Sequence, residues 1–341
     1  MTAARLELTR EQILAHRRLV GALDERLPPG PDSLRRAAWA GLQDSMPRAA
    51  LLSIHARVEG TEPATWEDPS LVQLWGPRFS AYVVAAPDIA VFTLGRMPAD
   101  DARRRTRAFD TAARLHTYLG GRTMTYGAAG RGLGRNPNSL RYAAPTGTVL
   151  MRWEGARQPT IWMVPPPVMG EAEARLELAR RYLHVFGPTT PAAYVRWAGA
   201  IPSVGRAAFD GLSASLIPAG TPIGEGWILS SDEAAFRARR DPVAGVRLLP
   251  SGDTYYLLNG RDRELLVPEA DHRAALWTSR VWPGALLVGG EVAGVWRRAD
   301  ADVTIETWRR LEPAERKAVE AEAASLPIPG NAGPIRVRWA D

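Results

Sequence analysis

The sequence predicts an α+β protein, predominantly helical, in which tandem winged-helix domains are followed by a C-terminal β-rich, barrel-like domain. Apolar residues recur at helical spacing before residue 242, and short alternating runs typical of β-hairpins interrupt them. After residue 242, short apolar or aromatic runs are separated by Gly, Pro and Asn-Gly, as in small β domains. The 341 residues exceed the usual size of one domain, so several small domains are expected.

Residues 1–96 are predicted to form the first winged-helix domain. Thr9 and Gln12 have the spacing of a capping box, which opens a helix that extends to about Leu27. Two further helical patterns and a strand pair with a Gly-Pro turn follow, over 32–45, 47–58 and 71–86. Three helices followed by a two-stranded ribbon are the plan of a winged helix.

Three more domains are predicted along the chain. Residues 97–168 form a degenerate winged-helix domain that begins with a strongly basic helix and contains a flexible glycine-rich loop at 127–134. Residues 169–241 form a third such domain, with a helix-turn-helix in which Thr190 caps a helix and Gly199 turns the chain. Residues 242–341 form the β-rich domain, which carries a charged C-terminal helix.

Composition narrows the class of protein. Hydrophobic residues make up 45% of the chain, so it can bury real cores, but no apolar run is long enough to cross a bilayer. The N-terminus lacks the pattern of a secretory signal, so a cytoplasmic protein is expected. The sequence shows no coiled-coil segment or obvious dimerisation helix, so a monomer is expected. The chain has no cysteine, and its five histidines lack paired spacing, so we expect no metal and no other cofactor.

Three adjacent polar residues, Gln43, Asp44 and Ser45, lie where two predicted helices meet. Such corners present polar side chains to a ligand. Ser45 is explained equally well as the cap of the helix that follows, and Asp44 can have the same role. Gln43 has no such structural explanation. His55 is placed as a supporting residue of the same cleft, although packing against its neighbours is the more usual role.

Several sequence blocks resemble, in order, the AlkZ/YcaQ family of bacterial DNA glycosylases. The blocks are "GLQ" at 41–43, "PRAALL" at 47–52, "SLVQLWGPRFSAYVVAAPDI" at 70–89, "RYLHVFGPTTPAAYVRWAGA" at 181–200, "GVRLLPSGDTYYLLNGRDRELLVP" at 245–268 and "LLVGGEVAGVWRR" at 286–298. The resemblance implies a monofunctional DNA glycosylase that excises N7-alkylated guanine from double-stranded DNA carrying alkylated purines. It further implies bulky natural-product adducts or crosslinks as substrates, in DNA repair or antibiotic self-resistance.

The resemblance also implies a catalytic pair. The family's pair is written Gln-apolar-Gln or Gln-apolar-Asp, and here Gln43 matches the first position while Ser45 stands at the second and Asp44 in the middle. Which residue completes the site stays open at this point. A carboxylate stabilises a developing cation better than a hydroxyl does, so Asp44 is expected to contribute more to the rate than Ser45.

The basic residues predict how the reaction and the binding proceed. Lys317 is the only lysine and lies in the charged C-terminal helix, so water should attack C1′ in place of a lysine amine, without lyase activity. The net charge of +6 suits phosphate contact. The candidate DNA-binding arginines are Arg48, Arg78, Arg131, Arg135, Arg141, Arg261 and Arg263. A non-catalytic winged-helix DNA-binding protein or regulator is the alternative function.

Overall fold

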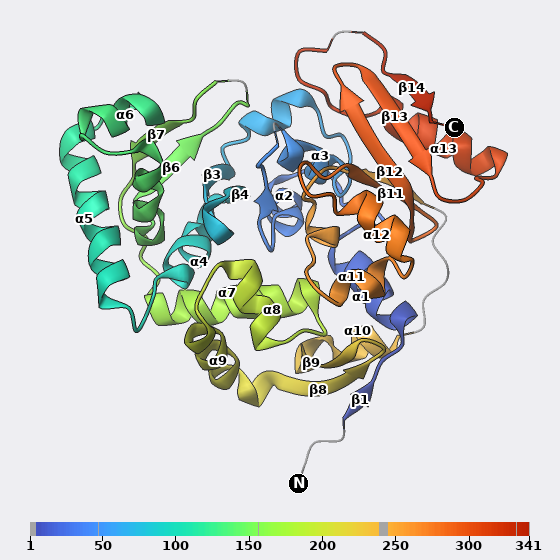
Figure 1. The fold of residues 1–341 in the computed structure, drawn as a ribbon, viewed down its shortest axis with the longest axis horizontal. Helices are drawn as coiled ribbons and strands as arrows, with labels where there is room; N and C mark the ends of the chain where they lie inside the picture. The colour runs from blue at the N-terminus through green and yellow to red at the C-terminus, as the bar shows by residue number, and fades with distance from the viewer. Residues whose placement is uncertain (1–4, 47, 156, 239–244, 332, 341) are drawn as a thin grey trace.

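Three β-sheets organise the chain in a computed structural model, which describes residues 5–46, 48–155, 157–238, 245–331 and 333–340. Helices pack between and around these sheets, so the α+β class predicted from the sequence is confirmed. In Figure 1, the segment from α5 to β7 lies on one side of the molecule and the C-terminal sheet on the other, with α2 and α3 between them.

The largest sheet joins the first two predicted domains. Its six strands lie in the order β2 (Leu42–Gln43), β4 (Ala81–Ala85), β3 (Leu71–Trp75), β6 (Val149–Arg152), β7 (Thr160–Met163) and β5 (Met124–Thr125). The junction is the antiparallel pairing of β3 with β6, where Gln73 lies opposite Met151. The predicted boundary at residue 96 therefore does not separate two sheets.

The N-terminal helices are shorter than predicted. α1 (Arg10–Val20) has the predicted capping box, but it ends at Gly21, and Ala22 takes a left-handed φ of 49°. α2 (Pro31–Ala37) and α3 (Ala49–His55) replace the helices expected over 32–45 and 47–58. Between them Gly41 has a φ of +71°, which favours glycine and directs the chain into β2.

α4 (Ile89–Thr93) ends the first predicted domain, and the second contains α5 (Ala102–Leu119) and α6 (Tyr126–Gly132), followed by a 3₁₀ segment (Pro137–Thr146). The prediction of a flexible glycine-rich loop at 127–134 was wrong, because most of it forms α6. Glycine is needed here for packing: a Cβ on Gly130 would lie 2.8 Å from Pro137. The absence of side-chain bulk lets α6 approach the 3₁₀ segment closely.

The third predicted domain contains α7 (Glu171–Phe186), α8 (Pro191–Ala198), α9 (Pro202–Gly211), the hairpin of β8 (Leu216–Thr221) and β9 (Gly224–Leu229), and α10 (Glu233–Arg237). Two local predictions are confirmed, since the Thr190 side chain accepts from the Ala193 N–H and Gly199 has a φ of +68°. β1 (Leu6–Glu7) pairs with β8, so the first residues described complete this small sheet. The winged-helix assignment of these units stays an interpretation of their element order.

The C-terminal sheet is open and not barrel-like in the residues described. Its strands are β10 (Val246–Leu249), β11 (Gly284–Val288), β12 (Glu291–Ala299), β13 (Asp302–Thr307) and β14 (Arg336–Trp339). The runs "TYYLLNG" and "RELLVP", predicted as β segments, form a 3₁₀ turn and α11 (Asp262–Leu266). α12 (Ala270–Leu276) follows, and α13 (Pro313–Ala324) packs against β10. No described helix is long and apolar enough to cross a membrane.

A buried ion pair fixes α3 to the C-terminal part of the chain. Arg57, just after α3, donates from Nη1 and Nη2 to the two carboxylate oxygens of Asp253 at 2.7 and 2.8 Å. The Ser53 hydroxyl donates to the same carboxylate at 2.6 Å. Because both charges are buried and hydrogen-bonded, loss of either partner would leave the other uncompensated. The loop after β10 is thereby held against the polar segment that precedes α3.

Candidate active site

The polar segment at 43–45 lies between α2 and α3 but is not helical, so the prediction that its residues form the last turn of one helix and the entry to the next was wrong. β2 pairs with β4, with Gln43 opposite Tyr82, and the Asp44 N–H donates to the Ala81 carbonyl at 2.8 Å. In an extended chain, alternate side chains point to opposite faces. Gln43 and Ser45 therefore lie on one side and Asp44 on the other.

The Gln43 amide is held at both ends. Its Nε2 donates to the Ser45 hydroxyl oxygen at 3.1 Å, and Arg78 Nη2 donates to its Oε1 at 3.1 Å. Gly252, in the loop after β10, faces the same amide, since a Cβ there would lie 3.5 Å from Gln43 Nε2. Arg78 is itself braced by Gly199 at the end of α8, where a Cβ would lie 3.0 Å from the Arg78 backbone. Arg78 and the loop after β10 therefore meet at Gln43, and the end of α8 supports Arg78 from behind.

Asp44 faces the protein interior, with 1% of its surface exposed. Its carboxylate accepts from the Ala50 N–H at 3.0 Å and from Gln73 Nε2 at 2.7 Å. Burial raises the pKa of the Asp44 carboxyl to about 7, although these hydrogen bonds and the nearby Arg48 charge oppose the shift. The arrangement makes Asp44 a positioning residue that fixes the start of α3, and it corrects the expectation that this carboxylate faces the cleft.

Two other predicted residues near the corner have structural contacts. His55 does not face Gln43, because its Nε2 lies 3.1 Å from the Ser325 hydroxyl at the end of α13. Burial lowers the pKa of His55 to about 4, so its ring is neutral at pH 7. The Arg48 guanidinium lies 4.2 Å above the Trp66 ring, and this stacking leaves Arg48 half-buried beside the corner.

The remaining predicted DNA-binding arginines are dispersed. Arg263 packs over Trp277 and donates to the Leu258 carbonyl at 2.9 Å, so it supports the fold around α11. Arg141 is half-buried. Exposed positions are occupied by Arg131, Arg135 and Arg261. Only Arg78 contacts Gln43 directly.

An apolar cavity of about 380 Å³ lies beside the corner, and sequence reasoning missed it. Its lining includes Met46, next to Ser45, together with Val281, Trp282 and Trp296, and the charged residues Arg297, Arg298 and Asp300 line it as well. Met46 and Val281 are unusually exposed for their type, at 38% and 50%. The lining comes from four separate stretches of chain, so no local sequence pattern indicates the cavity.

A second cluster, away from the corner, contains groups that could hold a metal ion. His16, His184 and Asp232 each offer a ligand atom, and these atoms lie within 4.8 Å of one another. The existing contacts account for most of the arrangement: His184 Nδ1 donates to Asp232 at 3.0 Å, and His16 Nε2 donates to the His184 carbonyl at 3.0 Å. Sequence spacing missed this cluster, because its members are 168 and 48 residues apart.

An amide clamped by an arginine, next to an apolar cavity and on a chain rich in exposed arginine, suits an enzyme that acts on DNA, and comparison identifies the class as DNA glycosylases. Residues 36–327 match a family model described as DNA glycosylase AlkZ-like, and the chain belongs to that family. The fold is similar to that of Streptomyces sahachiroi DNA glycosylase AlkZ, with a TM-score of 0.79 and 18% sequence identity over 98% of this chain and 100% of that one. A comparison with curated proteins finds no match.

Proposed function

We propose that this glycosylase excises N7-alkylated guanine from double-stranded DNA, bulky natural-product adducts or crosslinks included, by water attack at C1′. Gln43 and Ser45 hold the water, and Arg78 fixes the orientation of the Gln43 amide. The observation that carries this proposal is the pair of hydrogen bonds that hold Gln43 between Arg78 and Ser45. The same contacts leave the Ser45 hydroxyl proton free to be donated to a water molecule.

The residues around Gln43 favour a substrate whose base leaves readily. In the described chain, its side-chain hydrogen-bond partners are a guanidinium and a hydroxyl, and the adjacent carboxyl of Asp44 points the other way. Such a site has no obvious acid to protonate a neutral leaving base. A guanine alkylated at N7 is already cationic, so it departs without protonation, and the enzyme needs chiefly to position water.

The apolar cavity beside Ser45 supports the bulky-adduct part of the proposal. The partly exposed Trp282 and the exposed Met46 offer stacking and polarisable contacts to an aromatic or apolar group attached to the base. A methyl adduct would not reach these contacts. The two substrate classes should therefore respond differently to changes in the cavity.

The proposal is tested by incubating the protein with N7-alkylguanine duplex and then cleaving abasic sites with alkali. We expect Gln43→Ala to lower single-turnover excision by about 10²- to 10³-fold, the usual effect of removing one preorganised polar group, while duplex binding persists. Gln158→Ala, which removes an exposed glutamine elsewhere, is the matched control. Excision by Gln43→Ala within a few-fold of wild type would remove Gln43 from the mechanism.

A second comparison tests the size of the substrate. We expect Trp282→Ala to lower excision of a polycyclic N7 adduct by about tenfold, the value of one lost stacking contact, and to leave excision of N7-methylguanine close to wild type. Equal losses on both substrates would contradict the assignment of the cavity to the adduct. Tight duplex binding without excision of either lesion would favour the non-catalytic alternative.

A further inference from the structure

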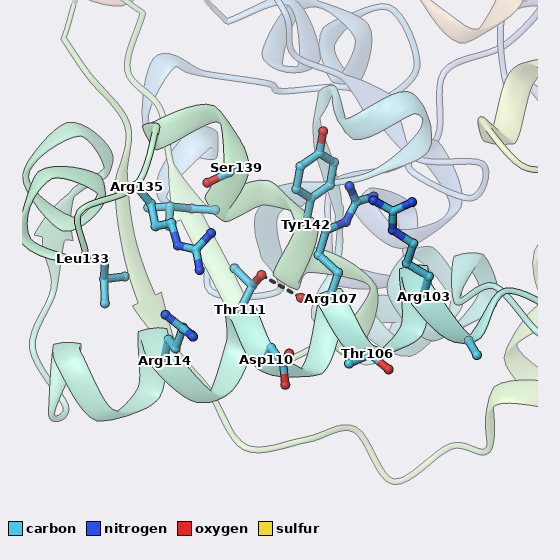
Figure 2. Close-up of a pocket in the computed structure, with 12 residues that line it drawn as sticks. Arg103, Thr106, Arg107, Asp110, Thr111, Arg114, Leu133, Arg135, Ser139 and Tyr142 are labelled. Carbon is cyan, nitrogen blue, oxygen red and sulfur yellow. Dashed lines mark hydrogen bonds between the residues drawn. The ribbon is translucent and has the colours of Figure 1, made fainter.

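We propose that a groove along α5 binds the phosphate backbone of the DNA duplex that flanks the damaged base. The proposal rests on the DNA substrate of the proposed function and adds a second contact surface, distinct from the corner at Gln43. The groove is a cavity of about 520 Å³ between α5 and the segment 133–142. Figure 2 shows its side chains, which come from one face of α5 and from that segment.

Four exposed arginines dominate the groove: Arg103, Arg107, Arg114 and Arg135. Asp110 is the single acidic residue among the groove's lining. A concave surface with this excess of guanidinium groups concentrates positive potential and favours an anionic partner. Arginine in particular matches phosphate oxygens with paired N–H donors.

The charges in the groove are not neutralised by neighbouring side chains. Arg104 and Arg105, on other faces of α5, pair with Asp101 at 3.0 Å and Glu171 at 2.6 Å. The four groove arginines form no ion pair within the described ranges. Apart from Asp110, the carboxylates near α5 thus pair with arginines on its other faces, and the four groove arginines keep their charge for a partner.

The spacing of these arginines fits an extended polyanion better than a single small ion. Arg103 and Arg114 are 11 residues apart on the helix, which corresponds to about 16 Å at 1.5 Å per residue. One DNA strand places a phosphate about every 3.4 Å along the duplex axis, so this distance spans about five phosphates. A free phosphate ion would contact only part of the row.

Packed side chains connect the wall of the groove to the corner at Gln43. The Arg107 guanidinium lies 3.8 Å above the ring of Tyr142, and that ring meets Phe79 edge to face with centroids 5.5 Å apart. Phe79 follows Arg78, which donates to Gln43. We infer that a strand bound along α5 lies on a part of the protein that is in packing contact with the corner at Gln43.

Salt-dependent binding of an undamaged duplex tests the groove without relying on excision. Each phosphate contact contributes about 0.9 to the slope of log affinity against log salt. We expect the triple variant Arg103→Ala, Arg114→Ala, Arg135→Ala to lower that slope by about 2.7. Arg107 is kept because it stacks on Tyr142. Because the duplex has no lesion, this experiment tests the groove alone, and the excision assay with Gln43→Ala tests the catalytic proposal separately.

A matched variant removes three positive charges elsewhere: Arg310→Ala, Arg316→Ala, Lys317→Ala, all exposed residues on or before α13. We expect its slope to equal that of wild type. Equal slopes for the two triple variants would contradict the proposal that the groove binds DNA, and would show that net charge alone sets the salt dependence. A final experiment titrates wild-type protein with inorganic phosphate at constant ionic strength. If phosphate saturates the groove while the groove variant keeps the wild-type salt slope for DNA, the groove is a site for small anions and not for DNA.

Asp110→Asn should strengthen DNA binding, whereas the arginine variants should weaken it. A gain in binding cannot be explained by a variant that folds poorly. Removing the one carboxylate among the lining residues should tighten duplex binding several-fold, because phosphates are repelled by it. Weaker or unchanged binding by Asp110→Asn would contradict the placement of phosphates along this face of α5.

Discussion

Replacing Asp44 by asparagine should remove a pH dependence from the stability of the whole chain. Burial raises the pKa of the Asp44 carboxyl from its ordinary value of 3.8 to about 7. A carboxyl whose pKa is higher in the folded state favours folding while it is protonated. Its contribution is thus fully present below about pH 4 and is lost as the pH rises through 7.

The size of the effect follows from this shift. About three pKa units at 1.36 kcal/mol each give a total of about 4 kcal/mol, of which about 2.5 kcal/mol changes between pH 5 and pH 8. Asparagine does not titrate, so Asp44→Asn should lack this change. The variant also loses one of the two acceptor interactions with Ala50 and Gln73, at a cost of about 1–3 kcal/mol. That cost is the same at both pH values.

Thermal unfolding at pH 5 and pH 8 measures the difference. Unfolding entropy of about 2.1 cal/mol/K per residue gives about 0.7 kcal/mol/K for 341 residues, so 2.5 kcal/mol corresponds to about 4 °C. We expect the Tm advantage of wild type over Asp44→Asn to be about 4 °C larger at pH 5 than at pH 8. Asp110→Asn, at an exposed site, serves as the control. An advantage that is equal at the two pH values would refute the buried, titrating carboxyl.

Three more predictions concern the corner and its frame. Ser45→Ala should lower excision about tenfold, because Gln43 loses a hydrogen-bond partner. This loss should exceed the loss caused by Asp44→Asn at pH 7. A larger loss for Asp44→Asn would indicate that Asp44 contacts the substrate directly. Borohydride should not trap wild-type protein on alkylated DNA, since Lys317 is exposed on α13, and trapping abolished by Lys317→Ala would place that helix over the site. Asp253→Asn should destabilise the chain by about 3–5 kcal/mol in urea unfolding, and the double variant Arg57→Leu, Asp253→Leu by less, because no charge is then left buried alone. A double variant less stable than the single would contradict that account.

Features that depend on a few neighbouring residues could be predicted from the sequence. The capping box at Thr9, the cap at Thr190 and the turn at Gly199 are each satisfied within a few positions, so their signals are local. β2 is different, since its partner β4 lies about forty residues further along the chain. A helical pattern before Gly41 therefore extended, in the prediction, into a segment that is a strand.

The sequence did not predict which way the side chains of the candidate site point. Gln43 was found through the family resemblance, but whether Asp44 and His55 face outward depends on β4 and α13, which the local pattern does not contain. The same holds for the arginines. Composition gives their number, whereas packing decides that Arg263 stacks on tryptophan and that Arg107 lies in an open groove.

The buried pair of Arg57 and Asp253 joins an early part of the chain to a part that is synthesised much later. Gln43 leaves the ribosome 210 residues before Asp253, which takes about 10–40 s at 5–20 residues per second. Over that interval Arg57 has no carboxylate, and Leu52 lacks its apolar neighbours Val246 and Leu248. A nascent chain that ends before β10 thus carries Gln43, Ser45 and Arg78 but lacks the carboxylate that pairs with Arg57, so the attachment of α3 to the C-terminal part of the chain forms only after Asp253 has been synthesised.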